Sequence, residues 1–177
     1  VDLETGYVER TFTFPTSPGR LAVTPDGARL WVALPIPSQG PNASGPDGFL
    51  AGFDLARQVK DRQYGIPVSP FALVATTNGQ LVVSSATGQW TETWVFDADT
   101  GTPLSDERSR HGTHLALHPS ETILYGANTD LSPSDIERYD LDAAGNLVRR
   151  WDSIYHGDHR MPGNVWASRR GEGVVTR

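Results

Sequence analysis

Residues 18–33 read PGRLAVTPDGARLWVA, which is two short apolar runs separated by a Pro-Asp-Gly turn. Asp and Gly tolerate the positive φ angles of a tight turn and Pro presets φ, so the stretch predicts two antiparallel strands joined by a hairpin. The same arrangement returns three times: at 70–83 (PFALVATTNGQLVV), at 112–125 (GTHLALHPSETILY) and, more weakly, at 162–175 (PGNVWASRRGEGVV).

A second phrase returns in step with the first. It reads VDLETG at 1–6, FDLAR at 53–57, FDADTG at 96–101 and YDLD at 139–142, and its aspartates are 52, 43 and 43 residues apart. Each copy predicts the end of a strand, a turn and a more polar returning strand, for example Tyr7 to Phe14. Two hairpins per period give four antiparallel strands, which is one propeller blade. No apolar run has the sustained i, i+3, i+4 spacing of a core helix, so the fold class is all-β.

These phrases resemble the YVTN-type β-propeller repeat, which is related to the NHL and gluconolactonase-like propellers. The matching residues are LAVTPDGARLWVA at 21–33 and the aromatic-Asp-x-x-Thr-Gly turns. The resemblance implies a β-propeller of four-stranded antiparallel blades. Proteins of this kind are often exported from bacteria, so it also implies an extracytoplasmic location, periplasmic or secreted.

The period divides the chain into about four blade-equivalents. We expect the end of one blade at 1–16, three blades at 17–64, 65–109 and 110–155, and the first hairpin of another at 156–177. Propellers usually contain roughly 4–8 blades, so we interpret the chain as part of a larger propeller. A compact four-bladed ring is the alternative. A partial propeller leaves strand edges unpaired at both ends, which predicts self-association unless another chain covers them.

Composition limits the partners. The net charge of -6 argues against a nucleic-acid partner, which calls for a basic surface, and against adsorption to an anionic membrane. No apolar run is long enough to insert into a membrane. The chain has no cysteine, so disulfides, thiolate metal sites and cysteine nucleophiles are excluded.

Histidines gather where propeller connections converge on one face. His111 opens the first strand of the 110–155 blade, and the segment 156–160, HGDHR, lies in the connection that follows this blade. Imidazoles suit general acid–base chemistry near neutral pH, and a guanidinium stabilises an anionic substrate or an oxyanion. We therefore select His111, His156, His159 and Arg160 as catalytic candidates. Each of them, taken alone, is better explained by a structural or solvated role in a loop.

Other positions are candidates for binding. Gluconolactonase-like propellers bind a divalent metal ion through acidic and amide side chains near the channel, and this resemblance implies Asp158 and Asn164 as metal ligands, although the sequence offers no complete set. Asn42 lies in the 35–48 loop, which departs from the repeat and is interpreted as a rim segment or a plain surface loop. Trp90 and Trp151 fit the strand pattern poorly, so we expect one of them to be exposed, and Trp90 is the candidate contact for a partner or a sugar. His114, beside His111, completes the ligand-binding candidates.

Two functions of different classes follow. The favoured one is a non-catalytic scaffold that binds a protein or a small ligand through its loop face. The alternative is a lactonase- or lyase-like enzyme with a His/Asp/Arg cluster at the channel mouth, and it requires His111, His156, His159 and Asn164 to surround one pocket. A propeller partnered with a redox domain elsewhere in a longer protein is a third option.

Overall fold

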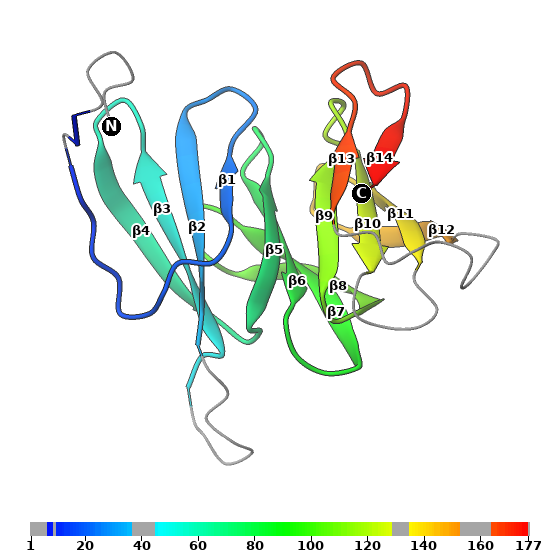
Figure 1. Cartoon of the computed structure of the whole chain (residues 1–177), viewed down its shortest axis with the longest axis horizontal. Helices are drawn as coiled ribbons and strands as arrows, with labels where there is room; N and C mark the ends of the chain where they lie inside the picture. The colour runs from blue at the N-terminus through cyan, green and yellow to red at the C-terminus, as the bar shows by residue number, and fades with distance from the viewer. Residues whose placement is uncertain (1–6, 9, 37–44, 129–134, 153–163, 177) are drawn as a thin grey trace.

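Antiparallel strands form the regular structure of this chain. A computed structural model describes residues 7–8, 10–36, 45–128, 135–152 and 164–176. Within these residues, three sheets of four strands and one sheet of two strands follow one another along the sequence (Figure 1). The part of the chain described contains no helix long and apolar enough to span a bilayer. The all-β prediction is confirmed.

We number the sheets as blades in chain order. Blade 1 comprises β1 (Leu21–Val23), β2 (Arg29–Pro35), β3 (Gly48–Asp54) and β4 (Val59–Ile66). Blade 2 comprises β5 (Pro70–Ala75), β6 (Gln80–Ser85), β7 (Trp90–Asp97) and β8 (Pro103–Arg110). Blade 3 comprises β9 (Thr113–Leu117), β10 (Ile123–Asn128), β11 (Ile136–Leu141) and β12 (Leu147–Asp152), and the last hairpin comprises β13 (Val165–Ala167) and β14 (Val174–Thr176).

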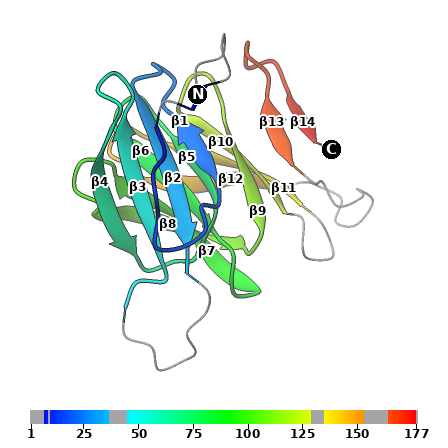
Figure 2. The same cartoon turned by 60° about the vertical axis from the view of Figure 1, so that its left-hand side comes forward.

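The blades follow one another in an arc. The first strands of successive blades contact each other, β1 with β5, β5 with β9 and β9 with β13, while the later strands of each blade lie further out. Figures 1 and 2 show blade 1 at one end of the arc and the β13–β14 hairpin at the other. Each strand pairs with its neighbour in sequence, as expected of propeller blades.

Tight turns join the first two strands of each blade, at the positions that the repeated phrase predicts. In blade 1 the hydroxyl of Thr24 donates to the carboxylate of Asp26 at 2.6 Å, and Gly27 has a φ of 70°. In blade 3 the corresponding position is Glu121, a non-glycine residue with a φ of 59°. Its carboxylate accepts hydrogen bonds from the amide and the hydroxyl of Thr77 in blade 2, at 2.6 and 2.9 Å, and these bonds offset the backbone strain.

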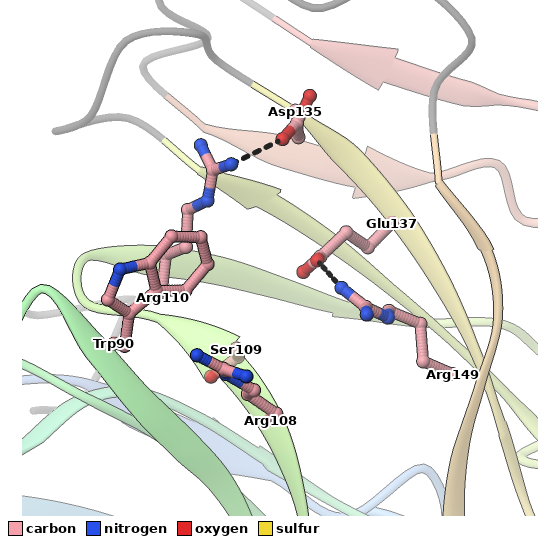
Figure 3. A pocket seen from close by; sticks show the side chains of 7 residues that line it. All are labelled: Trp90, Arg108, Ser109, Arg110, Asp135, Glu137 and Arg149. Carbon is pink, nitrogen blue, oxygen red and sulfur yellow. Dashed lines mark hydrogen bonds and ion pairs between the residues drawn. The ribbon is translucent and has the colours of Figure 1, made fainter.

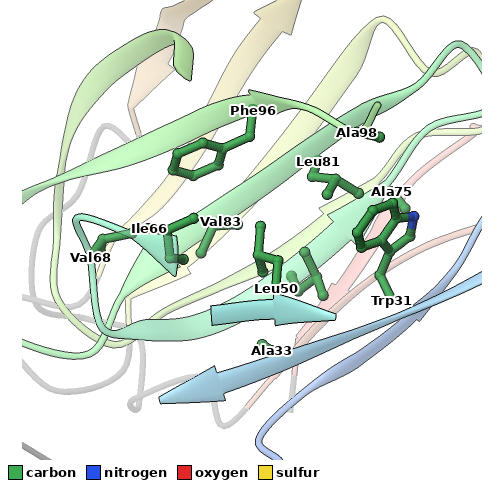
Figure 4. Packing of buried hydrophobic residues seen from close by; sticks show 11 residues of the cluster. Trp31, Ala33, Leu50, Ile66, Val68, Ala75, Leu81, Val83, Phe96 and Ala98 are labelled. Atoms are coloured by element: carbon green, nitrogen blue, oxygen red, sulfur yellow. The ribbon is translucent and has the colours of Figure 1, made fainter. Parts of the chain in front are cut away.

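Apolar side chains alternate between the two faces of each blade and fill the wedges between blades. On β2, Trp31 and Ala33 face blade 2 and join a buried cluster with Leu81 and Phe96, seen in Figure 4. Val32 and Leu34, which alternate with them, belong to a separate cluster on the opposite face. This period of two is what a strand covered on both faces requires.

Neighbouring blades also interlock at their outer strands. The ring of Tyr64 on β4 lies against Gly101, in the turn between β7 and β8, so closely that a Cβ at Gly101 would lie 2.6 Å from Tyr64 Cδ1. Leu104 on β8 lies against Gly145 of blade 3 in the same way. Gly101 has a φ of 73°. The glycine of the Thr-Gly turn is therefore required twice, by its backbone angle and by the side chain of the preceding blade.

The prediction of a strand from Tyr7 to Phe14 is wrong. The described residues before β1 form no strand. Instead the rings of Phe12 and Phe14 pack edge-on against Phe53, at 4.8 and 6.0 Å, on the face of blade 1 that points away from blade 2. Polar alternation alone does not make a strand, and these residues contact blade 1 through their side chains without forming a strand ladder.

Candidate ligand-binding site

A cavity of about 290 Å³ lies between blades 2 and 3. It is found at the end where the β6–β7, β8–β9 and β10–β11 connections lie, since Trp90 begins β7, Arg110 ends β8 and Asp135 immediately precedes β11. This is the loop face on which a binding site was expected. Figure 3 shows the side chains that line the cavity: Trp90, Arg108, Ser109, Arg110, Asp135, Glu137 and Arg149.

Two guanidinium groups flank the indole of Trp90. Trp90 and Arg110 are paired across β7 and β8, and Arg108 lies two residues earlier on β8, so that its side chain projects to the same side. The guanidinium carbons of Arg108 and Arg110 each lie 5.0 Å from the indole centroid, within the range of cation–π attraction. Trp90 nevertheless remains 55% exposed. Part of the Trp90 indole is thus exposed to solvent beside two positively charged groups.

Two buried carboxylates form the wall opposite Trp90. Asp135 and Glu137 are only 3% and 4% exposed. Arg110 pairs with Asp135 at 3.3 Å, and Arg149 pairs with Glu137 at 3.0 Å. A carboxylate buried this deeply strongly destabilises the fold unless it is paired and hydrogen-bonded. The two ion pairs therefore fix the positions of Arg110 and Arg149.

The hydroxyl of Tyr139 donates a further hydrogen bond to Glu137. Tyr139 is fully buried, and this burial, with the neighbouring charge of Glu137, raises the pKa of the phenol far above its ordinary value. The phenol therefore stays protonated over the whole physiological range and acts as a permanent donor to the Glu137 carboxylate.

Arg108 differs from the other two arginines of the cavity. Within the residues described, no ion pair involves Arg108, and its guanidinium contacts the Trp90 ring. Glu92 faces it across the β7–β8 pair without forming an ion pair. The carboxylate of Glu107 accepts from the backbone amides of Arg108 and Arg149, at 3.0 and 3.1 Å. Among the described residues that line the cavity, Arg108 is therefore the guanidinium without an ion pair, although two carboxylates lie near it.

Among the predicted site residues that the structure describes, Trp90 lines the cavity. His114 is buried 4.8 Å from the ring of Phe71, and its Nδ1 lies 3.4 Å from Nη2 of Arg20. It therefore lies near the first strands of all three blades, and its role in binding stays a prediction. Neither it nor the half-buried His111 lines the cavity.

The metal and catalytic hypotheses stay predictions. Asn164 Oδ1 accepts a hydrogen bond from the amide of Val165 at 2.9 Å, so its side chain satisfies the start of β13. No group of three His, Cys, Asp or Glu suited to a metal ion occurs in residues 7–8, 10–36, 45–128, 135–152 and 164–176. The remaining candidates lie outside the described residues: Asn42, His156, Asp158, His159 and Arg160.

Sequence reasoning missed the arginines and carboxylates of the cavity. Arg108 and Arg110 stand in an alternating polar strand, 103–110, which is typical of an exposed outer strand. Asp135 and Glu137 come from another blade, and nothing in their local sequence predicts burial. The one available signal was Trp90, an aromatic residue at a position where the wedge between blades does not need one.

Comparisons with known proteins identify the fold. No protein-family model matches this sequence, and no curated protein matches it. Among solved structures, Kuenenia stuttgartiensis hydrazine synthase is similar with a TM-score of 0.68 and 18% identity, over 97% of this chain and 45% of that one. A functionally unknown protein from Desulfotomaculum acetoxidans gives 0.67 and 15%, over 91% and 49%. The Dos1 propeller gives 0.64 and 12%, over 90% and 39%.

These likenesses define a class of fold and nothing finer. The described blades are those of a β-propeller, as the sequence predicted. This chain spans less than half the length of each of the three structures. At such low identities the fold is shared while the function is free to differ.

Proposed function

We propose that this chain is part of a YVTN-like, extracytoplasmic β-propeller that binds a protein or a small ligand through its loop face without catalysing a reaction. The observation behind the proposal is the cavity between blades 2 and 3, where Trp90 is 55% exposed beside the guanidiniums of Arg108 and Arg110. Tryptophan and arginine are the residues that most often dominate binding energy at interfaces. Here they occur together at the end of the fold where the connecting loops lie.

The chemistry of the cavity favours binding over catalysis. Among the described residues, its lining contains no histidine, and Asp135 and Glu137 are both paired with arginines. A general base must be able to take up a proton, and a carboxylate fixed between an arginine and a tyrosine is poorly suited to that task. The lactonase- or lyase-like alternative depends on the 156–160 segment and gains no support from this cavity.

A fragment screen observed at the tryptophan side chains tests the proposal. The chain has five tryptophans, so its indole N–H signals form a small set in an NMR spectrum of ¹⁵N-labelled protein, and the variant Trp90→Phe assigns the signal of interest. We expect fragments that shift the Trp90 signal in a saturable way.

Trp166 is the matched control for this screen. It is 47% exposed, but it lies on β13, away from the cavity. Fragments that move the Trp90 signal and leave the Trp166 signal unchanged support the loop face as a binding site. A screen in which no fragment moves Trp90, or in which every active fragment moves both signals equally, refutes the proposal.

A further inference from the structure

The chemical class of the occupant can be inferred from the charges of the cavity. Resting on the binding function proposed above, we infer that the cavity between blades 2 and 3 accepts a single carboxylate attached to an apolar group, with Arg108 as the residue that binds the carboxylate. The basis is the position of the Arg108 guanidinium, which makes no ion pair with any described residue, beside the exposed indole of Trp90 and next to the ion pairs of Arg110 and Arg149.

The charges around Arg108 favour an occupant with one negative charge. In the described lining Arg110 pairs with Asp135 and Arg149 pairs with Glu137, whereas Arg108 makes no ion pair. A carboxylate of the occupant would supply the ion pair that Arg108 lacks, while Glu92 and Glu107, which also lie near Arg108, disfavour a second negative charge. A phosphate dianion would bring an excess negative charge close to two buried carboxylates, and like charges in a partly desolvated site repel strongly.

The geometry of Arg108 suits a carboxylate. A guanidinium stacked on an aromatic ring keeps its N–H edge free in the plane, and two parallel N–H donors match the two oxygens of a carboxylate. Contact with the Trp90 ring, whose centroid lies 5.0 Å from the guanidinium carbon, also limits the rotamers of the long side chain, so less entropy is lost when a ligand binds. Ser109, which lies between the two stacked arginines on β8, is 2% exposed and adds little polar surface.

The size of the cavity and its indole indicate the rest of the occupant. A volume of about 290 Å³ is at the lower end of ligand pockets, so the site holds one side chain or one small molecule. The exposed edge of Trp90 offers apolar contact beside the charged anchor. Two sources meet this description, a free small carboxylic acid and an acidic side chain next to an apolar residue of a partner protein.

The test compares matched probes on the intact chain. The probes are 3-phenylpropionate, its neutral amide 3-phenylpropionamide, phenethyl phosphate, and the blocked dipeptide N-acetyl-Phe-Glu-amide, each titrated while the Trp90 indole signal is followed. We expect the carboxylate to bind at least about ten-fold more tightly than the amide, the difference typical of one charge-assisted hydrogen-bonded pair. We expect Arg108→Gln to reduce that ratio to about one.

Arg150→Gln is the control for this variant. Arg150 lies on β12, pairs with Asp140 at 2.9 Å and does not line the cavity, so the same substitution there should leave the ratio unchanged. Thermal unfolding of both variants checks that they are folded. A ratio that falls equally in both variants overturns the assignment of Arg108.

The outcomes separate the inference from the proposed function. If the amide binds as well as the carboxylate, or the phosphate binds more tightly, the carboxylate inference is overturned while the loop face remains a binding site. If no probe moves Trp90 but fragments of another class do, the inference again fails alone. Tighter binding of the blocked dipeptide than of 3-phenylpropionate supports a partner protein as the source, and the reverse order supports a small carboxylic acid.

Discussion

Gly101→Ala tests how the outer strands of neighbouring blades fit together. The new methyl group would lie 2.6 Å from Cδ1 and 2.7 Å from Cβ of Tyr64, whereas carbon atoms in ordinary contact are about 3.5–4.0 Å apart. Tyr64 cannot retreat freely, because its ring stacks on Trp31 and its hydroxyl donates to the carbonyl of Asp99 at 2.5 Å. Overpacking of this kind costs about 1–3 kcal/mol, and a φ of 73° adds about 1–2 kcal/mol for alanine.

We therefore expect Gly101→Ala to lower the free energy of unfolding by about 2–5 kcal/mol, the sum of these two costs. Gly79→Ala separates the two contributions, since Gly79 has a φ of 83° but no atom within 4 Å of the position that an alanine methyl group would take. This control should lose only the backbone cost of about 1–2 kcal/mol.

Urea unfolding followed by circular dichroism measures both variants. The double variant Tyr64→Ala/Gly101→Ala then tests the contact itself, because the second substitution should cost less once the ring is removed. Equal losses for Gly101→Ala and Gly79→Ala, together with additive effects in the double variant, would refute the idea that Tyr64 presses on the turn of the next blade.

Three further predictions concern hydrogen bonds and charge. Tyr139→Phe should cost about 1.5–3 kcal/mol, because it removes the buried hydroxyl that donates to Glu137, and an unchanged midpoint in urea would contradict this. Hydrogen bonds from the Thr100 amide and hydroxyl lower the pKa of Asp97, so this carboxylate stabilises the fold above pH 3.8, its ordinary pKa, and the gain is lost as the pH falls through the lower folded value. Stability measured from neutral pH down to pH 2.5 should therefore fall less steeply for Asp97→Asn than for the parent, and parallel curves would disprove the role of Asp97. Arg62→Ala removes an ion pair to the exposed carboxylate of Asp99 and a hydrogen bond to the carbonyl of Ala98, both in the next blade, and should cost about 1–2 kcal/mol in thermal unfolding, so an unchanged midpoint would contradict this role.

The blades could be predicted from the sequence because their signals are local. Turn residues such as those at 24–27 must lie within a few positions of the strands they join, and the strand period is visible in any short window. The segment from Tyr7 to Phe14 shows the limit of this reasoning. Its pattern is that of an outer strand, but a strand also needs a paired neighbour, and Phe12 and Phe14 pack as side chains on blade 1 instead.

The cavity could be predicted only in part, because it is assembled from two blades. Trp90 was recognisable because the packing between blades does not require an aromatic residue at its position. Arg108 was not, because an arginine on an outer strand is normally solvated. Asp135 and Glu137 have ordinary local sequences, and their burial depends on how closely blade 3 packs against blade 2.

The position of the cavity across a blade boundary has a thermodynamic consequence. In a repeat architecture each unit is stabilised mainly by its own folding and by its nearest neighbours. A ligand that contacts Trp90 on β7 and the cavity walls on β8 and β11 would stabilise the boundary between blades 2 and 3. At a ligand concentration of a hundred times the Kd, this stabilisation is about 2.7 kcal/mol. Amide hydrogen exchange should then slow in β7, β8, β11 and β12, while the exchange rates of blade 1 stay unchanged. The difference between the exchange rates of the blades would therefore report whether the cavity is occupied.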